Sequence, residues 1–298
     1  MNKNAELTWM DIISKSIDIH KILELLSKVP KEKEEEILEK AIETIDFSID
    51  DNYAIKYAAR CGDTSMVKFL LGVKRVDPTA ENSYALRYAA RCGKDKVVKL
   101  LLEDGRADPT AMDNYAIKYA SRCGHVKIQK LLLEDGRADS AADDNYAIKV
   151  AARYGFDESV KLLLGDQRVD PSADRNYALR VAARCGCTEA LKLLLKDKRV
   201  NPAEKDNYAL RVAAKFENDD IIKELLQDTR VDPTACDNAA LKLAAENGSF
   251  VSIRLLIEDE RTNSLKDNEE ALEIAEENFH SEIANILRLR IKSIKENN

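Results

Sequence analysis

Long apolar runs are missing from this chain of 298 residues. No stretch approaches the roughly 20 residues that a membrane-spanning helix needs. The apolar residues of the first segment are interrupted by Asp11, Lys15 and Asp18, so the uninterrupted apolar core of a signal peptide is also missing. These absences predict a soluble, cytoplasmic protein with no membrane partner.

An excess of basic residues is missing as well. Lys and Arg number 47 against 54 Asp and Glu, which gives a formal net charge of -7. Nucleic-acid-binding domains are usually strongly basic, because they must neutralise phosphates. We therefore expect no nucleic-acid partner from the overall charge, although a local basic stripe is compatible with it.

Residues that commonly build catalytic and metal sites are few and scattered. The ten glycines stand singly, so no glycine-rich loop is present to cradle a phosphate. Cys185, Cys187 and Cys236 do not form the two ligand pairs of a zinc site. The three histidines lie far from these cysteines in the sequence, at His20, His125 and His280. We expect no catalytic residues, no metal and no cofactor, and hence a protein that is not an enzyme.

A strict period of 31 residues is what the sequence has instead. It is marked by a tyrosine that recurs at Tyr53, Tyr84, Tyr115, Tyr146, Tyr177 and Tyr208, with Ala239 and Glu270 at the next two positions. A fixed period of about 20 to 50 residues is typical of a solenoid, in which each unit packs only against its neighbours. Such an array has no single deep pocket for chemistry, so the period favours a binding surface over an enzyme.

One repeat, residues 144–174, shows how each unit is expected to fold. Residues 146–154 suit a short helix that is capped by Asn145 and ended by Gly155 in a left-handed conformation. A second helix is expected over residues 159–164. Alanines gather on one side of the first helix, and the proline of the closing RVDP linker fixes an extended turn. The predicted fold is therefore all-α, a stack of helix pairs.

The segments AIKVAARYG and SVKLLL stand where ankyrin repeats have Pro-Leu-His-x-Ala-Ala-x-x-Gly and Ile-Val-x-Leu-Leu-Leu. Over residues 51–298 the chain therefore resembles the ankyrin repeat family. The resemblance implies an ankyrin-type helix-pair solenoid, an adaptor that binds a partner protein on its concave face. The unit has 31 residues where the family has about 33, which predicts short connecting loops.

The DNYAI form of the unit, followed by VDP in the linker, is similar to divergent ankyrin units of amoebae and of the giant viruses that infect them. This resemblance implies a place in the host cytoplasm if the chain is viral or an effector. It carries no information on the identity of the partner.

The repeat frame predicts four segments. Residues 1–18 form an N-terminal extension helix, and residues 19–50 form a degenerate N-terminal cap repeat. Residues 51–267 hold seven ankyrin-like repeats of 31 residues. Residues 268–298 form a C-terminal cap repeat, in which glutamates replace the Tyr, Lys, Ala and Arg of other units and keep its outer side wettable.

The face of the first helix opposite the alanines is the predicted binding surface. Its tyrosines and the basic residues seven positions later recur from unit to unit, whereas the tip of the connecting linker varies. Arginine forks hold carboxylates and tyrosine gives contact area at little entropic cost, so the expected partner presents an acidic segment. The predicted partner-binding residues are Tyr53, Arg60, Tyr84, Arg91, Tyr115, Arg122, Tyr146, Arg153, Tyr177, Arg184, Tyr208 and Lys215, with the tips Glu81, Met112, Asp143 and Asp174.

Three other interpretations stay open. The basic residue three positions after each tyrosine, such as Lys149, stands where the family has a partly buried histidine and would then be neutralised by acidic linker residues such as Asp144. The ladders of tyrosine and arginine also suit single-stranded nucleic acid or another phosphate-bearing ligand. A purely structural spacer is the third interpretation. In each case we expect a monomer.

Overall fold

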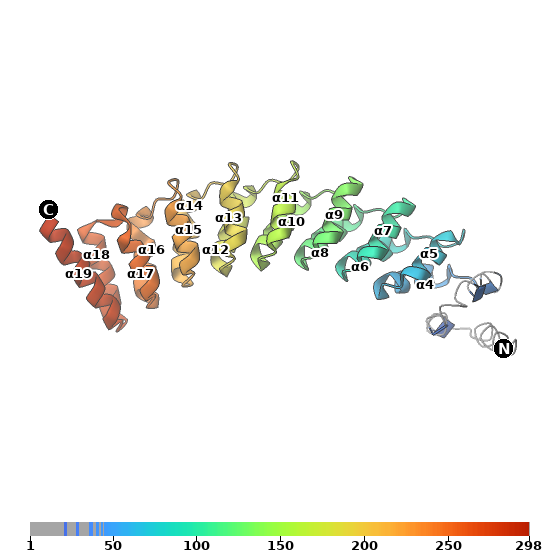
Figure 1. Ribbon diagram of the computed structural model, residues 1–298, viewed down its shortest axis with the longest axis horizontal. Coiled ribbons are helices and arrows are strands. Elements are labelled where there is room, and N and C mark those ends of the chain that lie inside the picture. Colours follow the sequence, from blue (N-terminus) through green and yellow to red (C-terminus); the bar gives the residue numbers. More distant parts are fainter. Residues whose placement is uncertain are drawn as a thin grey trace. The chain divides into compact units, whose positions relative to one another are not determined.

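The structure is a computed structural model, which describes residues 45–297 together with residues 21–22, 28–29, 36–37, 40–41 and 43 (Figure 1). Every regular element in this part of the chain is a helix. The predicted extension helix over residues 1–18 lies outside the described residues, and so does about half of the predicted cap repeat over residues 19–50.

The chain divides into two compact units, residues 1–139 and residues 140–298, which we call the N-unit and the C-unit. The helices of the N-unit are α4 (Ile49–Cys61), α5 (Thr64–Gly72), α6 (Ala80–Arg91), α7 (Asp95–Asp104), α8 (Ala111–Arg122) and α9 (Val126–Asp135). Those of the C-unit are α10 (Ala142–Tyr154), α11 (Asp157–Leu164), α12 (Ala173–Cys185), α13 (Thr188–Lys196), α14 (Glu204–Lys215), α15 (Asp219–Gln227), α16 (Ala235–Asn247), α17 (Phe250–Glu258), the 3-10 helix η1 (Glu260–Thr262), α18 (Leu265–Glu277) and α19 (Ser281–Asn297). Helices with even numbers are the first helices of their repeats, and those with odd numbers are the second helices.

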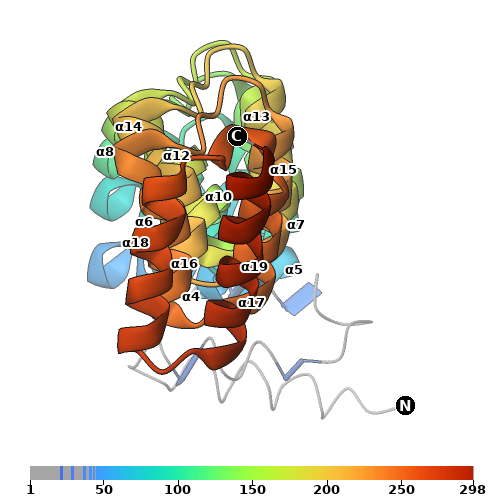
Figure 2. The same cartoon turned by 90° about the vertical axis from the view of Figure 1, so that its left-hand side faces the viewer.

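Within each unit the helices form two rows. In the N-unit the first helices α4, α6 and α8 pack side by side, the second helices α5, α7 and α9 do the same, and each first helix packs on the second helix of its own repeat. The C-unit has the same arrangement from α10 to α19, and Figure 2 shows its last pair, α18 and α19, nearest the viewer. This is the all-α helix-pair solenoid with short loops that the sequence predicts.

Alanines and leucines form the core of each repeat. In the C-unit Ala147 and Ala151 of α10 and Leu163 of α11 are fully buried, and their equivalents in the other repeats are buried as well. Small side chains allow neighbouring first helices to approach closely, while burial of one leucine stabilises the fold by about 1.5–3 kcal/mol. The core is nearly the same in every repeat, so the repeats differ mainly on their surface.

A left-handed turn precedes the regular part of each first helix from α4 to α16, and its contacts contradict one prediction. In α10 the residues Asp143, Asp144 and Asn145 have φ of 56°, 53° and 60°, and regular right-handed helix follows only after them. Asp and Asn tolerate this conformation better than most residues with a β-carbon. The prediction that Asn145 caps the helix is wrong, because its side-chain oxygen accepts a hydrogen bond of 2.7 Å from the backbone N–H of Asp170 in the next linker. The same bond joins Asn52 to Asp77, Asn114 to Asp139, Asn176 to Asn201 and Asn207 to Asp232.

Arginines join successive linkers. Arg199 donates through Nη1 to the carbonyl of Val169 in the preceding linker at 2.6 Å and through Nε to the carboxylate of Asp197 at 3.0 Å. The same pair of contacts is made by Arg106, Arg137, Arg230 and Arg261. Hydrogen bonds from Arg168 and Ser140 lower the pKa of Asp166 from 3.8 to about 2. The linkers are therefore held to one another by charge-assisted hydrogen bonds, which are stronger than neutral ones.

Glycine occupies the turn between the two helices in most repeats, and Glu217 and Phe279 take the same left-handed place between α14 and α15 and between α18 and α19. Gly155 has φ of 66°, which confirms the predicted left-handed end of α10. A β-carbon at Gly186 would lie only 2.9 Å from Oδ1 of Asn218 in the following repeat. The amide of Asn218 donates to the carbonyl of Ala183 at 2.8 Å, and His125 contacts the end of α6 in the same way. Each of these side chains caps the first helix of the repeat before its own.

Candidate partner-binding surface

The first basic column is engaged within the protein. It consists of Lys56, Arg87, Lys118, Lys149, Arg180 and Arg211. Arg180 donates through Nε to the carbonyl of Arg175 at 3.0 Å and through Nη2 to that of Asp174 at 2.9 Å, inside the left-handed turn of its own repeat. Arg87 and Arg211 make the equivalent bonds. Lys118 pairs instead with the carboxylate of Asp113 at 2.7 Å, so the column holds the turns in place and its charges are occupied.

The second basic column is exposed. It consists of Arg60, Arg91, Arg122, Arg153, Arg184 and Lys215, one on each first helix from α4 to α14. Arg91 donates to the hydroxyl of Tyr115 at 3.2 Å. Among the described residues, no carboxylate forms an ion pair with Arg60, Arg153, Arg184 or Lys215, whose charges therefore lack an internal counterion.

The tyrosines of the N-unit stack on one another. The ring centroids of Tyr84 and Tyr88 on α6 are 4.0 Å apart, and those of Tyr115 and Tyr119 on α8 are 3.9 Å apart. Tyr88 and Tyr115 join the two pairs across the repeats at 6.2 Å. The guanidinium of Arg87 lies 5.2 Å from the centroid of Tyr115 and also faces Tyr84 and Tyr88. The predicted site residues Tyr84 and Tyr115 are therefore connected through Tyr88 and Arg87, which are not among the predicted site residues.

The predicted set of site residues does not include the tyrosines at the fifth position of the first helix, counted from the repeating tyrosine, although the sequence indicates them. Tyr57, Tyr88 and Tyr119 each follow a predicted site tyrosine by four positions, which places both rings on one side of a helix. The repeating tyrosine occurs in six repeats and marks the 31-residue period, whereas the second tyrosine occurs in only three repeats and is a weaker pattern.

The tyrosines of the C-unit are separated by cations. At the fifth position this unit has Val150, Val181 and Val212, which are buried. The guanidinium of Arg180 lies 5.4 Å from the centroid of Tyr177 and 5.5 Å from that of Tyr208. A cation over an exposed ring contributes about 0.5–1 kcal/mol. Tyr177 and Tyr208 are therefore held singly, between cations, while Tyr146 is half-buried at the start of regular helix in α10.

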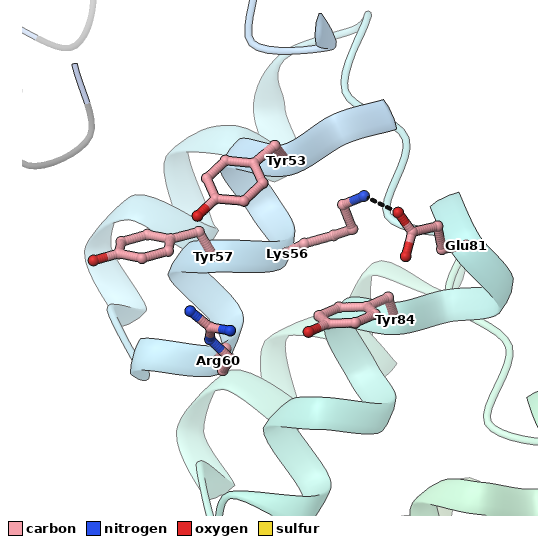
Figure 3. Close-up of a pocket in the computed structure, with 6 residues that line it drawn as sticks. All are labelled: Tyr53, Lys56, Tyr57, Arg60, Glu81 and Tyr84. Atoms are coloured by element: carbon pink, nitrogen blue, oxygen red, sulfur yellow. Dashed lines mark hydrogen bonds and ion pairs between the residues drawn. The ribbon is translucent and has the colours of Figure 1, made fainter. Parts of the chain in front are cut away.

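A pocket opens between α4 and α6 of the N-unit. Its volume is about 170 Å³, and its walls are Tyr53, Lys56, Tyr57, Arg60, Glu81 and Tyr84. Figure 3 shows the rings of Tyr53 and Tyr57 on α4, the ring of Tyr84 on α6, and Lys56 extended toward the carboxylate of Glu81, with which it forms an ion pair. Four of the six lining residues belong to the predicted site.

The predicted tip residues occupy one place in the fold. Glu81, Met112, Asp143 and Asp174 are the first residues of successive left-handed turns, and all four are exposed. The first basic column uses the backbone carbonyl of this position in Glu81 and Asp174. The backbone carbonyl is used whatever the side chain, which allows the residue type to differ between repeats. The side chains of two tips also pair with the first basic column: the carboxylate of Glu81 holds Lys56, and that of Asp174 lies 3.9 Å from the guanidinium of Arg180.

Among the described residues, no group of three or more His, Cys, Asp and Glu is placed to hold a metal ion. All six cysteines are free thiols. The described helices include none that is long and apolar enough to cross a membrane.

A stack of alanine-rich helix pairs with a regular face of basic and aromatic side chains defines a repeat protein that presents a surface. The family model for ankyrin repeats in three copies matches residues 20–113, 55–144, 117–206, 148–237 and 210–297. The chain belongs to the ankyrin repeat family. Ankyrin repeats are in general protein–protein interaction modules.

The solved structures that are similar to this chain include two ankyrin repeat domains. An ankyrin repeat domain from Acinetobacter baumannii AYE is 29% identical with a TM-score of 0.51, and the match covers 59% of this chain and 98% of that one. The ankyrin repeat domain of Bcl-3, a member of the IkappaB protein family, is 23% identical with a TM-score of 0.56, covering 68% of this chain and 97% of that one. The second likeness concerns the fold alone. No curated protein matches the chain significantly.

Proposed function

We propose that this chain binds a partner protein on the face of its first helices and that the partner presents an acidic segment to it. The observation that carries the proposal is the difference between the two basic columns. The first column is bonded to backbone carbonyls and carboxylates, whereas Arg60, Arg153, Arg184 and Lys215 have no carboxylate partner among the described residues. A row of cations without internal counterions attracts carboxylates and steers their approach.

The tyrosines support the same proposal. The stacked tyrosines of the N-unit and Tyr177 and Tyr208 of the C-unit are half-buried, and stacking or neighbouring cations hold their rings in place, so a partner that covers them loses little side-chain entropy. A surface of fixed rings beside exposed guanidiniums, such as those of Arg60 and Arg184, resembles the aromatic and arginine-rich centres that dominate many protein interfaces.

Single-stranded nucleic acid is the competing ligand, because rings and cations also suit bases and phosphates. Exposed carboxylates at the starts of the first helices, such as Asp113 and Asp144, favour the protein. A phosphate chain carries charge at every nucleotide and meets these carboxylates along its length. An acidic segment need only place its carboxylates beside the second basic column.

The proposal includes an adaptor that is monomeric and cytoplasmic, with seven ankyrin-like repeats over residues 51–267 and cap repeats on either side. Six free thiols suit a reducing compartment. Sedimentation equilibrium of the purified chain tests the monomer, and imaging of the tagged chain in its native cell tests the compartment.

The test of the proposed function is a selection from a random peptide library against the full chain, followed by affinity measurements on the selected peptides. We expect enrichment of Asp and Glu. Charge reversal of Arg60, Arg91 and Arg122 in the N-unit, or of Arg153, Arg184 and Lys215 in the C-unit, is expected to weaken binding at least about tenfold in the unit that holds the peptide. The affected triple identifies that unit.

Matched controls lie on the second helices. Lys68, Lys99 and Lys130 form an exposed basic column of the N-unit, and Lys161, Lys223 and Arg254 form its counterpart in the C-unit. Reversal of these triples changes the net charge equally and is expected to leave peptide affinity within about twofold. Enrichment of non-acidic peptides, or micromolar binding of single-stranded RNA that falls steeply with salt, would overturn the proposal.

A further inference from the structure

The tyrosine stack of the N-unit is interrupted between Tyr57 and Tyr84. In the next pair of repeats the equivalent rings, Tyr88 and Tyr115, are stacked at 6.2 Å. Tyr57 stacks on Tyr53 within α4, at 5.8 Å, but makes no ring contact with Tyr84. The pocket of about 170 Å³ fills this interval, and Figure 3 shows it with Tyr57 and Arg60 on one side and Tyr84 on the other.

One residue accounts for the interruption. In α6 the flat guanidinium of Arg87 faces Tyr84, Tyr88 and Tyr115 and donates to two carbonyls of the left-handed turn. The equivalent residue of α4 is Lys56, whose single ammonium turns to the carboxylate of Glu81 instead. A lysine cannot lie as a plate between rings and also fork to two acceptors. The place that the Arg87 guanidinium takes in one repeat is therefore open in the other.

We infer that this opening binds one aromatic ring from the partner, next to a carboxylate, and so anchors the acidic segment. The inference rests on the proposed function and names the side chain that the surface selects. A cavity of about 150 Å³ accommodates a benzene ring, and this one is of that size. An inserted ring would lie between Tyr57 and Tyr84, which line the opening together with Lys56. The ammonium of Lys56 lies 5.9 Å from the Tyr84 centroid and can face an inserted ring as it faces that of Tyr84.

The charged residues at the edge of the pocket determine which charged group of the partner can lie next to the inserted ring. Arg60 stands over Tyr57 at 5.8 Å and pairs with no carboxylate of the described residues, so it offers a fork to a carboxylate beside the ring. On the opposite side Glu81 and Asp51 flank Lys56, with side chains 48% and 59% exposed. Two carboxylates there repel a phosphate chain that crosses the pocket, which favours a protein side chain over a nucleobase.

The experiment compares two fluorescein-labelled acidic peptides, Gly-Glu-Asp-Trp-Asp-Glu-Gly and the same peptide with Ala for Trp, by anisotropy against the full chain. We expect the ring to improve affinity roughly tenfold. Lys56→Arg fills the opening as Arg87 does and keeps the charge, so the ring preference is expected to fall below about twofold while affinity for the Ala peptide is unchanged.

Two further variants keep the inference falsifiable. Tyr57→Val removes one wall and copies the residue that the C-unit has at this position, so it is expected to abolish the preference even if Lys56→Arg unfolds. Lys149→Arg is the matched control in the C-unit and is expected to preserve it. Phenylacetate is the small probe, and it is expected to shift tyrosine ring signals of the wild-type chain in NMR spectra but not those of Lys56→Arg.

The outcomes separate this inference from the proposed function. Equal affinity of the wild-type chain for both peptides, or a ring preference that survives Lys56→Arg and Tyr57→Val, overturns the inference and leaves the acidic-segment proposal standing. Phenylacetate shifts that depend on Lys56, without peptide binding, support the ring pocket and count against the proposed function. Tight binding of labelled oligothymidine with no binding of either peptide overturns both.

Discussion

The N-unit and the C-unit have equivalent cores and differ in the residues beside the repeating tyrosines of their first helices. Leu101 and Leu194 are both fully buried at equivalent places, and the paired alanines are buried in both units. On the face, the residue four positions after the repeating tyrosine is Tyr88 in α6 but Val181 in α12. The two units show that substitutions at this position change the tyrosines from stacked rings to single rings between cations, while the buried alanines and leucines of the core stay the same.

The two units also differ in where their surface aromatic side chains lie. In the N-unit half-buried tyrosines stack along the first helices, whereas in the C-unit several exposed rings lie at the turn that joins the two helices of a repeat. There Tyr154, Phe216 and Phe279 are 48%, 45% and 90% exposed. The guanidinium of Arg184 faces Phe216 at 5.3 Å, so the second basic column reaches the turn in this unit. Similar arginines therefore serve two different aromatic surfaces.

The largest effect is expected from the core, and it should be alike in both units. Leu101→Ala and Leu194→Ala each remove a fully buried side chain, and each is expected to lower the free energy of unfolding by about 2–5 kcal/mol. Urea denaturation followed by circular dichroism measures the loss. A difference between the two variants of more than about 2 kcal/mol would break the comparison, because the cores would then not be equivalent.

The next effect concerns acid. The pKa of Asp166 in the C-unit is about 2, below the value of about 3.9 in an unfolded chain, so its ionised form stabilises the fold above pH 4. That stabilisation is lost as the pH falls through 2. Asp166→Asn is expected to cost about 1–2 kcal/mol at pH 7 and progressively less as the pH falls through 2, as judged from urea midpoints across this range.

The matched variant for the acid effect lies in the N-unit. Arg137 also lowers the pKa of Asp135, but the place of Ser140 is taken there by Pro109, so one hydrogen bond is missing. Asp135→Asn is therefore expected to cost less than Asp166→Asn at pH 7. An equal or larger cost would show that Ser140 contributes nothing.

A smaller effect is expected from exchanging the residues that distinguish the units. Tyr88→Val removes the central ring of the stack and is expected to cost about 0.5–1.5 kcal/mol. Val181→Tyr places a second ring four positions after Tyr177 and is expected to add a tyrosine band to the near-ultraviolet circular dichroism spectrum. If Val181→Tyr leaves that spectrum unchanged, the fifth position alone does not decide between stacked and single rings.

The smallest effect is expected at the tips of the left-handed turns. Met112 has φ of 54° and is 57% exposed, so Met112→Gly relieves backbone strain without loss of packing and is expected to raise stability by about 0.5 kcal/mol. Asp143→Gly in the C-unit should gain less, since aspartate tolerates this conformation better. Thermal melts of the two variants measure the difference, and a larger gain at Asp143 would contradict the strain argument.

Much of the fold was predictable from the sequence because it depends on local patterns. The 31-residue period, the alanine face and Gly155 at the end of α10 are each encoded by residue types that favour one structure. The left-handed turn was not predictable in this way. Asparagine before a helix suits both a cap and a left-handed residue, and the choice depends on the N–H of Asp170, which lies 25 residues further along the chain.

The candidate surface was predictable as columns of residues but not as contacts. The sequence places Lys56 and Arg87 in the same column, and both look like exposed cations on a helix. Their difference appears only in three dimensions, where one bonds to Glu81 and the other lies among three rings. The pocket beside Lys56 follows from that difference, so it could not be expected from a pattern that treats lysine and arginine as equivalent.

The capping contacts between repeats run in one direction along the chain, from a side chain of one repeat to a carbonyl of the repeat before it. Asn218 and Arg199 each reach back to carbonyls of an earlier segment. Removal of a repeat from the carboxyl side of either unit takes away the side-chain donors that bond to the carbonyls of the repeat before it. Removal from the amino side takes away only acceptors, so the donors of the remaining repeats bond to water. Truncation from the amino side thus leaves the remaining helices with their caps, whereas truncation from the carboxyl side exposes an uncapped helix end, so unravelling should proceed inward from the carboxyl side.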